Sequence, residues 1–553
     1  KVIIYFLESF MIKIIVFFLL VLNVASCNIT KKNLEIYKNN HKERGSSDSA
    51  TFLTANYYIS KGDAYTASKI LNKRIESSKL LQLKFFSNLV SGNFEVAHNI
   101  SVLLTPDFKK NSMYHLPRYI INIKKNIINQ NLEFLEDNNP SIGLNNLTPL
   151  IKLWVLKEQN KIDLKFNNNY QKWSIHELLI LENFHKPANL KKIADEIYTS
   201  ENLNSNDILL LAGFFFRLKD FDKFDKIVRT KLSDQFDKEY IVKNFSANNN
   251  IFYKTPTLHT ILASKIYNIS ASNNKQNENS YTYSFQKILL EMSLYLCPNL
   301  DIAKYSLAEI YNLEKTNEIA LNKLESISFG SFFFLPSNLK KLSVIKSLDN
   351  EHDYKNLLFK FKKKWPTNKF ILYRLATYYK SRKKYYQSIK IYKNIIKIYG
   401  ESDRVLFLYA SNLDKIGKWN DAKILFLNLL KKNPKDTYTL NYVSYKLALK
   451  NQDLDFALSL IKKALKLDPD NGYFLDTIGW VEFKRKNYNK ATFYLEKSIS
   501  ILPKSSEVLD HLGDSYLMLG RKNEAIFEWK KAIKYEKDKY TIKIIQEKLS
   551  KYE

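Results

Sequence analysis

From Thr51 onward, apolar residues recur at spacings of three and four positions, and short polar stretches interrupt them. This period places the apolar side chains on one face of an α-helix, whereas a β-strand would require strict alternation. The stretch LDTIGWVEFKRKNYNKATFYLEKSI, which begins at Leu475, returns 34 residues later as LDHLGDSYLMLGRKNEAIFEWKKAI, beginning at Leu509. The chain therefore repeats a unit of two helices, and a period of this length is typical of a helical array.

Each repeat has small residues where its two helices must lie close together. The first helix has one at a fixed position, and the second helix has another. A large apolar residue then follows on the second helix, and a proline ends that helix because proline cannot continue it. The small residues are Ala376, Ala410, Gly479 and Gly513 on first helices and Ala422, Ala491 and Ala525 on second helices; the large residues are Phe426, Leu495 and Trp529, and the prolines are Pro434, Pro469 and Pro503.

This unit resembles the tetratricopeptide repeat, a helix–turn–helix of 34 residues. The resemblance implies an all-α fold, an α–α superhelical solenoid in which each helix pair buries its faces against its neighbours. The repeat that begins near Thr437 has one extra residue in its turn, KNQDLD, and looks like a form common in tetratricopeptide proteins of Gram-negative bacteria. Residues 537–553 are expected to form a capping helix, because the outer face of KIIQEKLSKYE is highly charged.

The strength of the resemblance differs along the chain. Regular repeats occupy residues 369–536, and weaker ones occupy 51–110 and 286–368. In residues 111–285 the pattern fades. Gly213 is kept in the stretch LLLAGFFFRLKDFDKFDKI, but a charged residue replaces the small residue of the second helix. We interpret this segment as degenerate helical repeats, with a separate helical insert as the alternative.

The first residues include a short apolar segment, MIKIIVFFLLVLNVASC, which begins at Met11. Its apolar run, residues 14–24, is too short for a comfortable membrane span and suits a signal peptide. The small residues directly before Cys27 resemble the lipobox of bacterial lipoproteins, in which the leader is removed and the cysteine is lipidated. The resemblance implies a signal peptide over residues 11–26 and lipid attachment at Cys27. The alternatives are ordinary cleavage after Ser26 and an uncleaved anchor that uses the upstream KVIIYFLESF.

Residues 27–50 are polar, contain GSS and are predicted to form a flexible tether between a membrane and the folded body. The lipobox implies a location in the bacterial cell envelope. In some bacteria an aspartate after the lipidated cysteine retains the protein in the inner membrane, and this chain has Asn28 there. We therefore expect a lipid anchor in the outer membrane rather than the inner, with the protein facing the periplasm.

The formal net charge of +30 first indicates an anionic partner such as nucleic acid. Most cations are lysine, which is abundant here together with other residues whose codons are AT-rich, so genome composition explains the charge without a ligand. Arginine, which binds phosphate better, is scarce. Nucleic-acid binding is disfavoured, and binding of an anionic polymer is a minor alternative. The 12 glycines and 12 prolines are few for 553 residues, which disfavours an all-β fold.

The sequence contains no recognisable catalytic or metal-binding motif. The stretch HELLI at His176 lacks the second histidine of a zinc helix, and the eight histidines are scattered. The acidic DFDKFD is predicted to lie in a solvated turn, and Cys297, at the end of an apolar helical face, is predicted to be a buried thiol. We therefore expect no enzyme activity, no cofactor and no metal. The alternative is an envelope enzyme, or an accessory subunit of one, with its site in residues 110–285.

The resemblance also implies a groove, because the first helices of tetratricopeptide arrays line the concave side, where partners often bind. Aromatic residues beside charged ones suit an extended peptide or a partner helix. For Trp480, packing against the next first helix is the alternative role. The predicted groove residues are Tyr373, Lys380, Phe407, Asp414, Trp480, Phe483, Lys484, His511 and Asp514.

The sequence thus predicts a membrane-anchored scaffold of the bacterial cell envelope that binds partner proteins or peptides. The principal binding surface is expected in residues 370–536, where the packing residues are most regular. One subtype of the family holds a peptide carboxylate with lysine and asparagine on successive first helices. That arrangement is absent here, since the corresponding positions are Tyr373, Thr377, Phe407 and Ser411.

Overall fold

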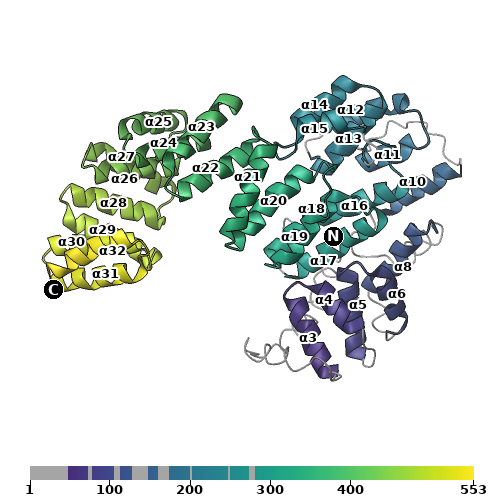
Figure 1. Ribbon diagram of the computed structural model, residues 1–553, viewed down its shortest axis with the longest axis horizontal. Coiled ribbons are helices and arrows are strands. Elements are labelled where there is room, and N and C mark those ends of the chain that lie inside the picture. Colours follow the sequence, from purple (N-terminus) through teal and green to yellow (C-terminus); the bar gives the residue numbers. More distant parts are fainter. Residues whose placement is uncertain are drawn as a thin grey trace, which may run out of the picture. The chain divides into compact units, whose positions relative to one another are not determined.

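The described part of the chain consists of helices and the turns and loops between them (Figure 1). This computed structural model describes residues 48–552 except 73–77, 105–111, 128–146, 160–172, 200–201, 247–249 and 273–279. No strand occurs among these residues, and the fold is an all-α solenoid of helical repeats. The predicted fold class is therefore confirmed. The predicted signal peptide, Cys27 and most of the predicted tether lie outside the described residues.

The chain divides into two compact units, residues 1–355 and residues 356–553, which we call unit 1 and unit 2. The division falls within helix α21 (Glu351–Lys364). The large apolar cluster of unit 1 and the smaller clusters of unit 2 share no residue. Each unit is therefore stabilised by its own core.

Unit 2 is a run of helix pairs in which the two helices of a pair pack along each other and each pair packs on the next (Figure 1). We call the members of a pair the first and second helix. The pairs are α22 (Lys369–Ser381) with α23 (Tyr385–Tyr399), α24 (Asp403–Lys415) with α25 (Trp419–Lys432), α26 (Thr437–Leu449) with α27 (Leu454–Leu467), α28 (Gly472–Lys484) with α29 (Tyr488–Ile501), and α30 (Ser506–Met518) with α31 (Lys522–Tyr535), followed by α32 (Lys539–Ser550).

Glycine allows the closest helix packing in two of these pairs. A Cβ atom on Gly479 would lie 2.7 Å from Cγ of Leu495 on α29, and one on Gly513 would lie 2.5 Å from Nε1 of Trp529 on α31. Both distances are shorter than side-chain packing permits, so a larger residue would push the helices apart. The expectation that small residues let the first helix lie against the second is confirmed at both positions.

Proline ends three second helices of unit 2. Pro434, Pro469 and Pro503 each lie two positions after the last residue of α25, α27 and α29. After two of these prolines, a short polar side chain caps the next first helix: Asp436 accepts a hydrogen bond from a backbone N–H of α26, and Asn471 accepts two from α28. Capping satisfies backbone donors that the first turn of a helix leaves without partners. Proline and the cap together therefore fix where one repeat stops and the next begins.

Unit 1 begins with two short helix pairs and continues as a less regular helical array. Within it, α16 packs along α17 and α18 packs along α19. Its helices are α3 (Asp48–Ser60), α4 (Ala64–Asn72), α5 (Ser78–Val90), α6 (Phe94–Val102), α8 (Ser112–Lys124), α10 (Thr148–Glu158), α11 (Ile175–Glu182), the 3-10 helix η2 (Pro187–Leu190), α12 (Lys191–Thr199), α13 (Ser205–Arg217), α14 (Phe221–Lys231), α15 (Lys238–Asn244), α16 (Leu258–Ser272), α17 (Ser280–Leu296), α18 (Asp301–Leu313), α19 (Asn317–Glu325) and α20 (Phe334–Ser347).

A buried ion pair joins distant parts of unit 1. Nζ of Lys287, on α17, lies 2.8 and 2.9 Å from the carboxylate oxygens of Glu314 and 3.3 Å from the carbonyl oxygen of Gly62, in the turn after α3. Gly62 has a φ of +78°, and a Cβ atom there would lie 2.5 Å from Oε2 of Glu314. Gly92, in the turn after α5, lies against the carboxylate of Glu291 in the same way. Two glycine turns therefore allow the amino-terminal helix pairs to pack on charged groups of α17 and α18.

Close backbone contact explains Gly213 on α13. A Cβ atom there would collide with the carbonyl oxygen of Phe252, in the loop before α16. The guanidinium of Arg217, one turn further along α13, donates to the same carbonyl oxygen at 2.8 Å and to both carboxylate oxygens of Glu182 at 2.7 Å. Gly213 thus allows the loop before α16 to lie directly against α13. Neither the repeat period nor the sequence around Gly213 predicts this contact.

His176 and Cys297 are core residues of unit 1. A ring nitrogen of His176 lies 3.2 Å from the hydroxyl of Ser264, and burial lowers the pKa of this histidine to about 3. It is therefore neutral at ordinary pH. Cys297 is a buried free thiol, as the sequence predicted, and burial raises its pKa.

Candidate protein-binding surface

One face of the first helices of unit 2 includes all the residues that the sequence placed in a groove. Positions three, four and seven apart lie on the same side of a helix. Helices α26, α28 and α30 contact one another in order, so corresponding positions are neighbours. We call this surface the first-helix face; it consists of Phe370, Tyr373, Thr377, Lys380, Arg404, Phe407, Ser411, Asp414, Tyr438, Asn441, Tyr442, Tyr445, Tyr473, Asp476, Trp480, Phe483, Lys484, Glu507, Asp510, His511 and Asp514.

An aromatic stack joins α28 to α30. The ring centroid of Trp480 lies 4.0 Å from that of His511 and 4.8 Å from that of Phe483, with interplanar angles of 16° and 4°. Nζ of Lys484 lies 4.5 Å from the centroid of the Trp480 ring. The structure thus brings four of the predicted groove residues together. Trp480 is only 6% exposed, which agrees with the packing alternative for this residue.

Hydrogen bonds of His511 extend the contact between first helices. Its Nδ1 lies 2.9 Å from Oδ1 of Asp476, and both side chains are buried. Burial alone lowers the pKa of His511, but the carboxylates of Asp476, Glu507 and Asp510 outweigh burial and raise it above 6.5. The hydroxyl of Tyr445, on α26, donates to Glu507. Side chains of three consecutive first helices are therefore linked.

The earlier first helices contact each other through polar side chains. Nε of Arg404, on α24, donates to the hydroxyl of Tyr373 on α22 at 2.8 Å. Nζ of Lys380 lies 3.4 Å from the hydroxyl oxygen of Ser411, and burial together with the nearby Lys415 lowers the pKa of Lys380. Both predicted residues of α22 thus contact side chains of α24.

Each predicted acidic residue contacts side chains of the helix two further along the chain. Oδ2 of the buried Asp414 accepts from the hydroxyl of Tyr442 at 2.9 Å and lies 2.9 Å from Nζ of Lys446. Phe407 packs edge-on against Tyr442, with ring centroids 5.6 Å apart. On α30, the carboxylate of Asp514 lies 2.8 Å from Nζ of Lys548, which comes from α32. These carboxylates stabilise the contacts between successive repeats.

Two exposed aromatic residues on this face were not among the residues predicted from the sequence. Tyr438 is 76% exposed and Tyr473 is 62% exposed, in the first turns of α26 and α28. Tyr473 lies seven positions before Trp480 and therefore shares its face. The helical period alone could have identified both tyrosines, because they lie two turns before the residues at the middle of the face.

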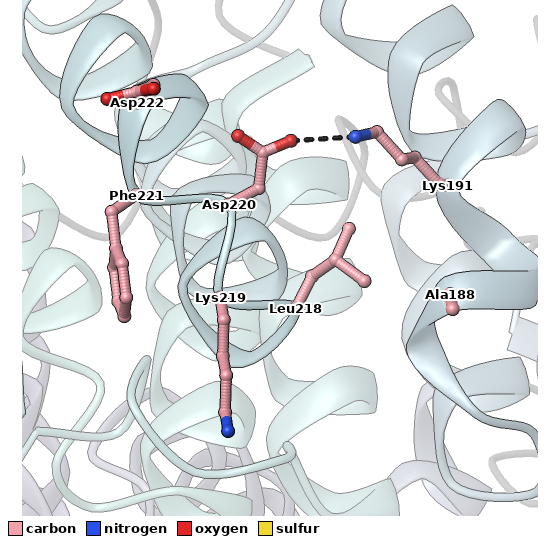
Figure 2. A pocket seen from close by; sticks show the side chains of 7 residues that line it. All are labelled: Ala188, Lys191, Leu218, Lys219, Asp220, Phe221 and Asp222. Carbon is pink, nitrogen blue, oxygen red and sulfur yellow. Dashed lines mark hydrogen bonds and ion pairs between the residues drawn. The ribbon is translucent and has the colours of Figure 1, made fainter.

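Unit 1 has a hollow of about 530 Å³ between the η2–α12 segment and the turn from α13 to α14 (Figure 2). Figure 2 shows the Lys191–Asp220 ion pair across it, with Nζ 2.9 Å from Oδ2. Oδ1 of Asp220 also caps α14 by accepting from the backbone N–H of Lys223. Asp220 belongs to the acidic stretch DFDKFD, and the residues that line the hollow do not include a nucleophile paired with a base.

The described part of the chain contains neither a metal-binding cluster nor a helix suited to span a membrane. No group of three histidine, cysteine, aspartate or glutamate side chains is placed there to hold a metal ion. Among the same residues, no helix combines the length and apolar character that a membrane span needs.

Two curated proteins are similar to this chain in sequence. A TPR repeat-containing protein of Pseudomonas aeruginosa is 25% identical over 218 residues, which are 39% of this chain and 36% of the relative. A TPR repeat-containing protein of Methanocaldococcus jannaschii is 34% identical over 121 residues, which are 21% of this chain and 20% of the relative. These relatives support a tetratricopeptide-repeat protein. The repeat match spans only 36% and 20% of the relatives' own lengths, and no family model matches the chain.

Solved structures also match the repeats, at low identity. A thermophilic TPR protein of Thermus thermophilus is 20% identical, with a TM-score of 0.29, over 32% of this chain and 95% of its own. PilW, a type IV pilus biogenesis factor, is 18% identical, with a TM-score of 0.30, over 33% and 85%. Yeast Tom70 is 14% identical, with a TM-score of 0.31, over 92% and 96%.

Proposed function

We propose that this protein is a membrane-anchored scaffold of the bacterial cell envelope, which binds partner proteins or peptides through the first-helix face of unit 2. The observation behind the binding role is the pair of exposed tyrosines, Tyr438 and Tyr473, on neighbouring first helices. Exposed aromatic side chains on a rigid surface are effective anchors, because they offer a large contact area with little loss of conformational entropy. The hydrogen bonds and aromatic stack between first helices supply that rigidity.

A double variant, Tyr438→Ala with Tyr473→Ala, tests the binding role. We expect each truncation to weaken partner capture by about 2 kcal/mol if the residue is an anchor. Thermal stability should not fall, because both rings are mostly in solvent. The measurement is crosslinking and pull-down from membranes with the tagged protein, followed by quantitative mass spectrometry of the proteins recovered.

The matched control removes two exposed aromatic rings from second helices. Phe493 and Phe527 are 51% and 61% exposed, on α29 and α31. The variant Phe493→Ala with Phe527→Ala should recover the same partners as the unmodified chain. Equal recovery by both double variants would exclude the first-helix face as the binding surface.

The anchoring role is proposed for Cys27, in the outer membrane with the protein facing the periplasm. It rests on the small residues that precede the cysteine after a short apolar segment. Each buried methylene of an acyl chain contributes about 0.8 kcal/mol, so several chains give stable attachment. We expect Cys27→Ser to abolish labelling by a fatty-acid analogue and to release the protein from membranes. Persistent labelling of this variant would show that the lipid is not attached there; Cys297→Ser, which changes a buried thiol, is the control.

A further inference from the structure

The turns that join first to second helices in unit 2 concentrate positive charge. Twelve cationic and four anionic residues occur in these five segments. The segments are residues 381–387 (SRKKYYQ), 415–421 (KIGKWND), 449–455 (LKNQDLD), 484–490 (KRKNYNK) and 518–524 (MLGRKNE), and together they form what we call the turn edge.

The segments that join one helix pair to the next contain more anionic than cationic residues. Five cationic and eight anionic residues occur in residues 399–405, 433–439, 467–473, 502–508 and 536–542. The lysine-rich composition of the chain applies to both sets of segments alike. The charge of the turn edge is therefore a local property, which composition alone does not explain.

Ion pairs engage most of the anions of this edge, one of them with Lys423, which lies on α25 just beyond the second turn segment. Nζ of Lys423 lies 2.9 Å from Oδ2 of Asp453, and Nη2 of Arg485 lies 2.7 Å from Oδ1 of Asp455. These two contacts, and a pair within the last turn between Arg521 and Glu524, engage three of the four anions. Nζ of Lys383 also lies 3.9 Å from Oδ1 of Asp538, outside the turn edge, but both side chains are largely in solvent. The net positive charge therefore remains mainly with the other exposed lysines.

Apolar side chains project among these lysines. Tyr386 is 69% exposed, Met518 is 49% exposed and Leu449 is 44% exposed. Each lies within, or at the start of, one of the five turn segments. The turn edge thus combines exposed cations with exposed apolar tips.

We infer that the turn edge of unit 2 binds the surface of a membrane that contains anionic phospholipids. Lysines near such a surface are attracted by its negative potential, and tyrosine and aliphatic side chains are stabilised at the boundary between headgroups and acyl chains. Nucleic acid fits this edge less well, because Leu449 and Met518 offer nothing to phosphates and most of the cations are lysine. The turn edge shares only Lys484 with the first-helix face, and the inference does not depend on Cys27.

The backbone allows two of the cations to be removed without damage to the fold. Lys383 and Lys486 have φ values of +56° and +63°, in the left-handed region that favours glycine. At the corresponding position, two other turns have Gly417 and Gly520. Glycine at Lys383 and Lys486 therefore removes charge and relieves backbone strain at the same time.

The test is co-sedimentation with vesicles at low salt. It uses the chain from Asn28 onward, which lacks Cys27 but keeps every described residue. We expect binding to vesicles that contain phosphatidylglycerol, no binding to pure phosphatidylcholine, and weaker binding as salt increases. The variant Lys383→Gly, Lys384→Gln, Lys486→Gly, Lys490→Gln should lower the partition coefficient at least about tenfold. Tyr386→Ser with Met518→Ser should also lower it, although the charge is unchanged.

The matched control removes the same charge from the second helices. Lys390, Lys393, Lys462 and Lys463 are exposed on α23 and α27, and replacing all four with glutamine should leave most of the binding intact. Circular dichroism melts confirm that each variant is folded. An equal loss in the control variant would show that net charge alone is responsible and would overturn the inference. The absence of vesicle binding, with retention on DNA or on an acidic polypeptide instead, would overturn it as well.

Discussion

Replacing Glu314 with alanine is expected to lower the free energy of unfolding of unit 1 by about 3–5 kcal/mol. The change leaves the ammonium group of Lys287 without its counter-ion, in a site where the lysine side chain is 2% exposed. Burial lowers the pKa of Lys287, and Glu314 is the strongest of the groups that oppose this shift. Hydrogen exchange of α17 and of the α3–α4 pair, followed in increasing urea, measures the effect in unit 1 separately from unit 2.

Two further variants make this test specific. Replacing both partners, as Lys287→Met with Glu314→Leu, should restore most of the lost stability, because no unpaired charge is left in the core. The matched surface control is Glu309→Ala, which removes a more exposed partner of Lys340 and should cost less than about 1 kcal/mol. If Glu314→Ala and Glu309→Ala cost the same, the Lys287–Glu314 pair is not an important link in unit 1.

Replacing Trp480 with alanine is expected to lower the stability of unit 2 by about 3–5 kcal/mol, because it would leave a cavity beside His511 and Phe483. The indole of Trp480 is buried, and its Nε1 has no hydrogen-bond partner. The Trp480→Phe variant keeps an aromatic ring in the stack and removes that nitrogen, so it should cost much less. Thermal melts and partner recovery are measured on the same protein samples.

The two measurements separate the two roles of Trp480. Lost stability, with capture intact in the fraction that stays folded, would assign the residue to packing alone. Lost capture at unchanged stability would contradict the packing role and make Trp480 an anchor. Tyr473→Ala, which changes an exposed residue on the same helix, should stay within about 0.5 kcal/mol in stability.

Much of unit 2 could be predicted from the sequence, because its packing is local. Gly479 against Leu495 and Gly513 against Trp529 join residues of one repeat, and the 34-residue period makes such positions visible. The packing of Gly213 could not be predicted in the same way. Its partner is the backbone of Phe252, in an irregular loop, and no period connects the two positions.

The sequence predicts which residues share the candidate surface, but it does not predict how exposed their side chains are. Placing Asp414, Trp480 and His511 on one face required only the repeat register. Their burial depends on side chains of the next repeat, such as Lys446 for Asp414, and the register does not show how these side chains fold over the face. The exposed residues instead lie in the first turns of the helices, where the next repeat covers less of the surface.

The contact of Gly62 with Lys287 has a consequence for how unit 1 forms. The two residues are 225 positions apart, whereas the helix pairs of unit 2 close within one repeat. Rates of folding fall as the sequence separation of contacting residues increases, because the entropy of closing the intervening chain is lost before the contact forms. On a ribosome, the α3–α4 pair must wait until α17 and α18 have emerged before it can complete its packing. Unit 2 needs no such delay, since each new helix pair can fold onto the one made just before it.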